Sequence, residues 1–305
     1  LHDSVRGPNK QLYSNLTNGE HTHTVFLTSF LYNGFTLGDN SSGTGATNVN
    51  GRPYVAWCWK AGGAAVSNTN GNITSSVSVN EEAGFSIVSY TGNGSNGQTV
   101  GHGLTQAPQW ILLKARDATQ NWRVWHHKLA ADGSKRLILD SNNASADASF
   151  LNDTAPTSTV FTLGNADNAF NSNGDKFIVY CWHEISGYSR FGSYKGNGNA
   201  NGSFVYTGFK PRFIMFKNAS TATNWEMYDT ARPYGLHNPA FRPVYANSNA
   251  VEETHGSLPA LDILSNGFKV RSTWDEFNKN GDTITYAAFA EKPSNTPFGT
   301  EPSAR

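Results

Sequence analysis

The chain has 305 residues, of which 15% are charged, and its formal net charge at pH 7 is +0. A chain of this length can bury two separate cores or one fused double core, so we expect two or three modules. Lys and Arg are spread thinly and form no basic stripe, which argues against a nucleic-acid partner. No stretch approaches the ~20 consecutive apolar residues of a membrane span, so a membrane partner is not expected either.

The composition favours short strands joined by tight turns. The chain contains 30 Gly, only 2 Met and 12% aromatic residues, and no long segment shows a 3.6-residue apolar period. Asn-Gly pairs can supply the positive φ angles of tight turns. They recur at Asn18-Gly19, Asn33-Gly34, Asn50-Gly51, Asn70-Gly71, Asn173-Gly174, Asn266-Gly267 and Asn280-Gly281.

Strands are predicted where β-branched and aromatic residues alternate with polar ones or run together. In chain order, the segments with this pattern are 54–60, 85–91, 110–114, 176–182, 213–217 and 283–289. Short strands, frequent turn signals and the absence of a helical period predict an all-β fold of tandem β-sandwich or jelly-roll-like modules.

An internal repeat defines the modules, because matching segments recur at constant spacings. One set of matches is Pro108, Trp110, Lys114, Trp122 and Trp125 with Pro211, Phe213, Lys217, Trp225 and Tyr228 (211 − 108 = 103). Another joins 161–184 to 268–291 (268 − 161 = 107), and 35–59 repeats part of that pattern. We expect the same helix-free backbone course in each matched pair of segments.

These matches predict the organisation of the chain as two full copies and one partial copy of the repeat. The expected parts are a partial repeat at 1–63, a linker or exposed crossing at 64–83, full repeats at 84–186 and 187–292, and a loose tail at 293–305. The partial repeat has a counterpart of the last strand, at 54–60, but none of 85–91 or 110–114.

Cys58 and Cys181 occupy equivalent repeat positions, where the third copy has Ala288. Both are expected to be small core residues that are buried, unpaired and free of metal.

His21 and His23, and the adjacent His126 and His127, are the residues that could ligate a metal. Neither pair has a Cys or carboxylate companion at a recognisable spacing. We expect surface or loop histidines, no metal site and no other cofactor.

Asp3 and Arg6 match Asp229 and Arg232, whereas the middle copy lacks the pair. A local ion pair that holds a turn is expected at both places, with little effect on stability if it is exposed.

Trp274 and Asp275 are the candidate ligand-binding residues. They replace Asp167 and Asn168 of the preceding copy, on a predicted loop before an Asn-Gly turn. An aromatic ring packs on the C–H surface of a sugar while a carboxylate accepts hydrogen bonds from its hydroxyls. The alternative is a tryptophan that packs under its own loop.

No catalytic residues are predicted, and we expect that the protein is not an enzyme. Gly92-Asn93-Gly94 follows a strand, but no helix follows it, so a phosphate-binding loop is not indicated. Hydrolysis of a polysaccharide needs two carboxyl groups about 5–9.5 Å apart, and the spacing of the acidic residues singles out no such pair.

Several ordered motifs resemble a phage domain family of unknown function. They include Asp3-Ser4-Val5-Arg6-Gly7, Lys10-Gln11-Leu12-Tyr13-Ser14-Asn15, Ala56-Trp57-Cys58-Trp59-Lys60-Ala61-Gly62-Gly63 and Leu264-Ser265-Asn266-Gly267-Phe268-Lys269. The resemblance covers Leu1 to about Lys292, and such sequences occur in tailed phages of marine and freshwater bacteria, including cyanobacteria. It implies a virion structural role, and the family has no catalytic signature.

The expected function is that of a bacteriophage virion structural protein, as a fibre, tail-tip or capsid-attached surface component that can also bind host-surface glycans. The expected location is the virion surface or another extracellular site, and the expected partners are other virion proteins, copies of the same chain and host-surface polysaccharide. A polysaccharide-degrading tailspike and a bacterial extracellular adhesin or filament subunit are the alternatives.

The strands that the partial repeat lacks are expected to come from preceding residues, from a neighbouring subunit or from a different virion protein, since bare sheet edges are unfavourable. Family members that resemble this chain usually begin with additional sequence, and no Met opens this one. We therefore expect a native product longer than the chain described.

Overall fold

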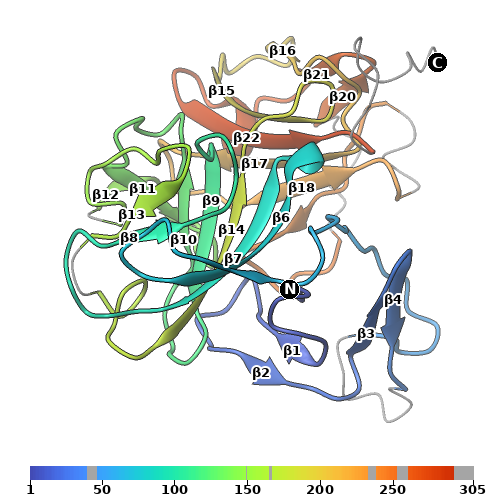
Figure 1. The fold of residues 1–305 in the computed structure, drawn as a ribbon. Helices are drawn as coiled ribbons and strands as arrows, with labels where there is room; N and C mark the ends of the chain where they lie inside the picture. The colour runs from blue at the N-terminus through green and yellow to red at the C-terminus, as the bar shows by residue number, and fades with distance from the viewer. Residues whose placement is uncertain (40–46, 149, 165–166, 233–237, 253–259, 292–305) are drawn as a thin grey trace.

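The computed structural model describes residues 1–39, 47–148, 150–164, 167–232, 238–252 and 260–291, and it consists almost only of strands and turns (Figure 1). This confirms the expected all-β class. The longest sheet has eight strands, in the order β12 (Ala146–Asp147), β11 (Lys135–Ile138), β10 (Arg123–His126), β9 (Trp110–Ala115), β14 (Lys176–Trp182), β7 (Phe85–Thr91), β6 (Ser75–Asn80) and β5 (Val66–Asn68).

The second sheet has five strands, in the order β15 (Ser189–Lys195), β22 (Thr283–Phe289), β17 (Phe213–Asn218), β18 (Glu226–Asp229) and β19 (Val244–Tyr245). A three-stranded sheet joins β16 (Phe204–Tyr206), β21 (Gly267–Val270) and β20 (Leu261–Leu264). Three strand pairs complete the fold: β8 (Thr99–Gly101) with β13 (Val160–Thr162), β1 (Lys10–Gln11) with β2 (His21–Thr22), and β3 (Leu27–Leu31) with β4 (Gly34–Leu37).

The two large sheets share one strand order. In the first, β10, β9, β14 and β7 are consecutive neighbours, and in the second the equivalent neighbours are β18, β17, β22 and β15. The strands predicted at 85–91, 176–182 and 283–289 form with those bounds, and β9 and β17 each run one residue further than predicted. We refer below to residues 1–63, 84–186 and 187–291 as the first, second and third units.

One short helix contradicts the expectation of helix-free segments. The single turn α1 (Asp275–Asn278) lies within 268–291, and the amide of Asn278 donates to the carbonyl of Trp274 at 2.7 Å. At the equivalent place in the second unit, the amide of Asn171 donates to the carbonyl of Asp167 at 2.8 Å. The backbone turns in the same way in both units, and the helix is one regular turn of that shared course.

The segment 64–83 is not the linker or exposed crossing that its small and polar residues suggested. It forms β5, β6 and the 3-10 turn η1 (Glu81–Ala83), and β6 pairs with β7 along its whole length. The expected tail at 293–305 lies outside the described residues.

Side chains point alternately to the two faces of the long sheet along its central strands, and two cores form as a result. On β14, Ile178, Tyr180 and Trp182 face the five-stranded sheet, whereas Val179 and Cys181 face the β8–β13 pair. Successive side chains of a strand point to opposite faces, so this strand is buried on both sides. The larger core is therefore shared between the second and third units, as in a sandwich of two sheets.

Three aromatic residues at equivalent positions meet in that shared core. Trp59, Trp182 and Phe289 come from the first, second and third units, and their ring centroids lie 6.4 Å (Trp59–Trp182), 6.5 Å (Trp182–Phe289) and 5.3 Å (Trp59–Phe289) apart. All three contacts are edge-to-face, a favourable geometry for aromatic rings. The central strands β14 and β22 and the segment 54–61 of the first unit therefore meet at one common axis.

The second unit binds the first through the same hydrogen bonds by which the third unit binds the second. The indole of Trp122 donates to the Tyr13 carbonyl at 2.8 Å, and that of Trp225 donates to the Ile138 carbonyl at 2.9 Å. The amide of Glu20 donates to the Arg116 carbonyl at 2.6 Å, and that of Ser145 donates to the Ala219 carbonyl at 2.9 Å. These partners keep constant spacings on each side of the contact (225 − 122 = 103; 138 − 13 = 125).

A buried lysine completes each junction. Lys114 donates to the carbonyls of Thr17 and Gln120, and Lys217 donates to the carbonyls of Asn142 at 3.0 Å and Thr223 at 2.7 Å. Burial lowers the pKa of Lys114 to about 8 and that of Lys217 to about 7. A buried amine is tolerated where its N–H groups have acceptors, and here those acceptors come from two different units.

The first unit differs from the other two. Residues 54–61 alternate between exposed and half-buried, with Trp57 and Trp59 packed on the shared core. They belong to no sheet, so the strand predicted at 54–60 does not form. Cys181 is buried as predicted, whereas Cys58 is exposed, contrary to the prediction, and both are free thiols. Cys58 lies on the side of the segment that no strand pair covers, because no strand among the described residues of the first unit flanks it.

Replacing Lys217 with Met tests the junction. The carbonyls of Asn142 and Thr223 lose their buried donor, so the free energy of unfolding should fall by about 1–3 kcal/mol, as measured by urea denaturation.

Lys135→Met is the matched control, because the side chain of Lys135 is 44% exposed and pairs with an exposed carboxylate. Its effect should stay within about 0.5 kcal/mol. Equal stabilities for the two variants would show that Lys217 does not hold the junction.

Candidate functional site

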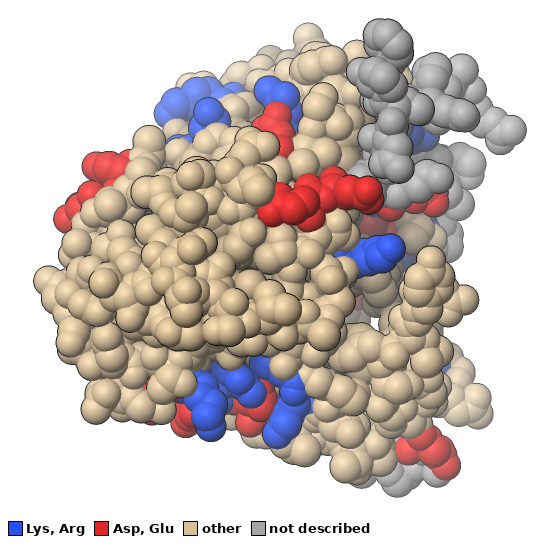
Figure 2. Space-filling model, viewed as in Figure 1, with Lys and Arg blue, Asp and Glu red and all other residues tan. Residues whose placement is uncertain are grey.

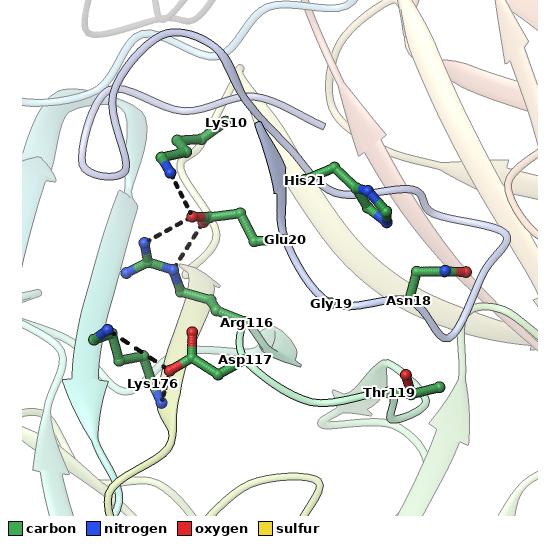
Figure 3. A pocket seen from close by; sticks show the side chains of 9 residues that line it. All are labelled: Lys10, Asn18, Gly19, Glu20, His21, Arg116, Asp117, Thr119 and Lys176. Atoms are coloured by element: carbon green, nitrogen blue, oxygen red, sulfur yellow. Dashed lines mark hydrogen bonds and ion pairs between the residues drawn. The ribbon is translucent and has the colours of Figure 1, made fainter. Parts of the chain in front are cut away.

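A polar groove of about 610 Å³ lies at the junction between the first and second units (Figure 3). Its residues come from β1, the loop into β2, the loop after β9 and the start of β14. They are Lys10, Asn18, Gly19, Glu20, His21, Arg116, Asp117, Thr119 and Lys176. Charged, amide and hydroxyl groups line this groove, so it suits a hydrophilic ligand.

Gly19 explains how the groove closes against the second unit. A Cβ at this position would lie 2.6 Å from the carbonyl oxygen of Arg116, closer than side-chain atoms approach a backbone oxygen. Because Gly19 has no Cβ, the next residue can place its amide 2.6 Å from that carbonyl. Here the Asn-Gly pair serves a close contact between units and not a positive φ angle.

Glu20 is the electrostatic centre of the groove. It accepts from Arg116 Nε at 2.8 Å and from Arg116 Nη2 at 3.1 Å, and Lys10 Nζ lies 3.6 Å away. Arg6 Nη1 lies 3.4 Å from the same carboxylate. Burial alone raises the pKa of Glu20, but the hydrogen bonds and charge of Arg116, with the charges of Arg6 and Lys10, lower it overall.

Lys176 and Asp117 form a looser pair at the other side of the groove. The amide of Lys176 donates to Asp117 Oδ2 at 3.1 Å, and its Nζ lies 3.8 Å from the same oxygen. The two side chains are 59% and 42% exposed, so the amine remains accessible. The exposed amines of Lys10 and Lys176 can therefore meet an anionic or hydroxyl-rich ligand.

Glu20 is poorly suited to act as a general acid. A general acid that works near neutral pH needs a raised pKa, whereas the pKa of Glu20 is lowered and its carboxylate already accepts from arginine. Glu20 therefore acts as a fixed anion that joins two units.

The candidate sugar-binding residues lie on α1, away from this groove. Trp274 is half-buried and packs edge-on against Phe277 with ring centroids 5.8 Å apart. Asp275 is exposed, and its carboxylate lies 3.3 Å from Lys279 Nζ. These contacts favour the alternative that the tryptophan packs under its own loop, and sugar binding here stays a prediction.

Among the described residues, no group of three or more His, Cys, Asp and Glu side chains could hold a metal ion. His21 stacks on His23 with ring centroids 5.8 Å apart, and His23 Nε2 lies 3.3 Å from the Tyr13 hydroxyl.

In the same described residues, no helix has the length and apolar character to cross a membrane.

The prediction of surface or loop histidines is wrong for His126, which lies buried on β10, whereas His127 lies in the turn that follows. His126 is buried, and His127 is partly buried. Their Nε2 atoms lie 3.1 Å from the Tyr286 carbonyl and 2.7 Å from the Phe191 carbonyl, so both side chains cross from the second unit to the third. No sequence pattern indicated these contacts, because the two carbonyls lie 160 residues from His126 and 64 residues from His127 along the chain.

Two buried histidines use both ring nitrogens in the neutral form. Nδ1 of His126 accepts from the amide of Lys128, and Nδ1 of His102 accepts from the amide of Leu104. The Nε2 atoms then donate, to the carbonyls of Tyr286 and Thr157. Burial, with a smaller contribution from neighbouring histidines, lowers the pKa of His126 to about 3 and that of His102 to about 4.

The ion pairs predicted to hold turns do so, and they are more buried than expected. Asp3 Oδ1 accepts from the amides of Val5 and Arg6, and Arg6 Nε pairs with Asp3 Oδ2, at 0% and 2% side-chain exposure. Asp229 and Arg232 repeat the arrangement, with an Nε–Oδ2 distance of 2.8 Å. In the first unit, the hydroxyl of Tyr180 also donates to Asp3, so this pair is part of a junction.

A family model described as "Domain of unknown function (DUF7483)" matches residues 1–293. Comparison with curated proteins found no match, and comparison with solved structures found none either.

The buried histidines predict how stability depends on pH. Their folded pKa values lie below the unfolded value of 6.5, so the unfolded chain takes up protons first as the pH falls. Their contribution is fully present above pH 6.5 and is lost toward pH 3–4, by about 1.4 kcal/mol per pH unit for each histidine. Urea denaturation between pH 7 and 5 measures this slope, in a range above the usual titration of carboxylates.

His126→Gln keeps a donor for the Tyr286 carbonyl but does not titrate, so it should reduce the slope by about one proton. His21→Gln, at an exposed position, is the control and should leave the slope unchanged. An unaltered slope in His126→Gln would assign the pH dependence to other groups.

Proposed function

The chain belongs to the DUF7483 family of domains of unknown function, and from the construction described above we propose that it is a structural component of a bacteriophage particle. The proposed place is a fibre, a tail tip or the outside of the capsid. The sequence motifs that resemble a phage domain family support this origin.

The observation that carries the proposal is the repeated head-to-tail junction. The same indole, amide and lysine hydrogen bonds join the first unit to the second and the second to the third. Contacts in which one surface meets a different surface of the next copy are those from which rings and fibres are built. A chain that uses this contact twice within itself has the design of an assembly component.

The aromatic core and the junction hydrogen bonds support a role as a rigid component of the particle that bears mechanical load. Aromatic side chains from three units fill the axis, and indole and lysine side chains donate to backbone carbonyls across both junctions. On the face shown in Figure 2, charged side chains form small separate groups on a mainly uncharged surface. Such a surface depends on shape and polar contacts for recognition more than on long-range charge.

We place the proposed contact with host polysaccharide in the polar groove of Figure 3. The amines of Lys10 and Lys176 are exposed, and Asn18 and Thr119 add amide and hydroxyl groups. These groups can hydrogen-bond sugar hydroxyls and pair with acidic substituents. Binding without cleavage is proposed, because Glu20 is held as a paired anion.

The particle role predicts where the protein is found. Phage particles banded in a caesium chloride gradient should contain its peptides by mass spectrometry, and antibodies against the purified protein should label those particles in electron micrographs. Recovery of the peptides only from the surface fraction of uninfected bacteria would overturn the proposal in favour of an adhesin.

The groove predicts which variant loses glycan binding. Lys10→Ala combined with Lys176→Ala should weaken binding to acidic host polysaccharide at least three-fold in biolayer interferometry, because both exposed amines are lost. Trp274→Ala tests the other candidate site, and a loss confined to that variant would move the contact to α1. Release of reducing ends during incubation would contradict binding without cleavage.

A further inference from the structure

The outer face of the three-stranded sheet in the third unit carries two exposed aromatic rings. Phe204 and Tyr206 of β16 are 48% and 58% exposed, whereas Val205 between them is buried. Successive side chains of a strand point to opposite faces, so the two rings stand on one face, on Cα atoms about 7 Å apart. Among the described residues, β16 is the outermost strand of its sheet (Figure 1). The rings therefore lie at an open edge.

The equivalent strand of the second unit is covered by another part of the chain. β8 pairs with β13 in the register in which β16 pairs with β21, so Thr99 is the equivalent of Phe204. The carbonyl of Thr99 accepts from the amide of Ile73 at 3.0 Å, in the segment that precedes the second unit. Only a short turn connects β14 to β15, and this connection supplies no such cover for the third unit.

The side chains of the third unit also exclude the same cover. In the second unit, Gly101 is the equivalent of Tyr206. A Cβ at Gly101 would lie 2.0 Å from Oδ1 of Asn68, which accepts from the amide of Asn70 at 2.9 Å. The covering segment therefore needs a glycine at this position, where the third unit has the full ring of Tyr206. An open aromatic surface replaces a covered edge.

Polar groups lie beside the rings on the same face. Lys269 of β21 pairs with Phe204, and Asp262 of β20 pairs with Lys269. Asp262 Oδ2 accepts from Arg271 Nη1 at 2.6 Å, and these two side chains are 14% and 44% exposed. Lys269 Nζ donates to the carbonyl of Gly202 at 3.0 Å. An amine and a carboxylate paired with a guanidinium therefore lie about 5–10 Å from the strand that carries the rings.

This face is too small for a stable protein interface. The two outer strands of a three-stranded sheet lie about 10 Å apart, and three residues of a strand span about 10 Å. The resulting area, on the order of 100 Å², is far below the ~800 Å² per partner that a specific protein complex buries. A sugar suits such a face, because its C–H surface packs on an aromatic ring while its hydroxyls hydrogen-bond the polar groups beside it.

We propose that the outer face of β16, β21 and β20 binds neutral β-linked hexose chains, with Phe204 and Tyr206 as the stacking surface. The amine of Lys269 and the carboxylate of Asp262 hydrogen-bond the sugar hydroxyls. Arg271 is already paired with Asp262, so an acidic sugar gains little from its charge. β-Linked glucose suits the rings because its hydroxyls are all equatorial, which leaves C–H groups on both faces of the sugar. The proposal extends the glycan binding of the proposed function to a second site, which shares no residue with the polar groove.

Cellohexaose is the probe for this site. With the intact protein, its axial C–H protons should receive saturation in saturation-transfer difference NMR, because they lie against the rings. Phe204→Ala combined with Tyr206→Ala should weaken binding about ten-fold, since both stacking surfaces are lost. Tyr206→Phe keeps the ring and should retain binding. Unchanged binding in the double alanine variant would overturn the proposal.

Tyr32→Ala is the matched control, because Tyr32 is an aromatic residue that is 97% exposed on a different hairpin. It should bind cellohexaose as the unaltered protein does. The side chains replaced in these variants are exposed, so each variant should unfold at the same urea concentration as the unaltered protein. A loss of binding in Tyr32→Ala as large as that in the double alanine variant would show that β16 is not the site.

The groove variant separates this proposal from the proposed function. Lys10→Ala combined with Lys176→Ala should keep the binding of cellohexaose, and its loss there would place the sugar in the groove and overturn the inference. Absence of saturation transfer at millimolar cellohexaose would also overturn the inference, whereas binding of acidic polysaccharide in the groove would stand on its own result.

A second copy of the chain is the competing occupant of this face. A doubled mass in sedimentation that returns to the mass of one chain in the double alanine variant would assign the rings to self-association and overturn the proposal. A mass of one chain in both proteins is the expected result.

Discussion

Two buried lysines hold the three units together. The arrangement of the units depends on the carbonyl groups that accept hydrogen bonds from these lysines. Lys114 and Lys217 project from strands that are otherwise apolar, and each amino group is removed from water. Such a group is costly to bury unless its N–H groups are satisfied. In each case one acceptor is a carbonyl of the same unit and the other is a carbonyl of the preceding unit.

This requirement makes the units interdependent. The central strand of each unit places one face in its own core and the other against its neighbours, as Cys181 and Trp182 show on β14. Neither the aromatic axis nor the lysine sites can form within one unit alone. The three units therefore form a single body, and at each junction the indole and lysine of one unit donate to carbonyls of the unit before it, while an amide of that preceding unit donates back.

The first and second junctions differ in the side chains that meet there. Glu20 binds the side chain of Arg116 at the first junction, where a polar groove lies, whereas the equivalent residues at the second junction are Ser145 and Ala219. The sequence alone did not indicate this groove, because its residues are scattered from 10 to 176 and each of them is an ordinary loop or edge residue. Trp274 was conspicuous in the sequence, and in the structure it packs against Phe277.

The sequence by itself determined the all-β class and the central strands at 85–91, 176–182 and 283–289, because alternation and β-branched residues act locally on the backbone. It also revealed the equivalent positions, since constant spacings survive changes of side chain. Only the tertiary structure decided which equivalents are buried. Cys58 and Cys181 share one local pattern, as do Phe35 and Phe161, yet one member of each pair is exposed and the other is not. Burial depends on strands that arrive from distant parts of a chain, and the first unit lacks those strands among the described residues.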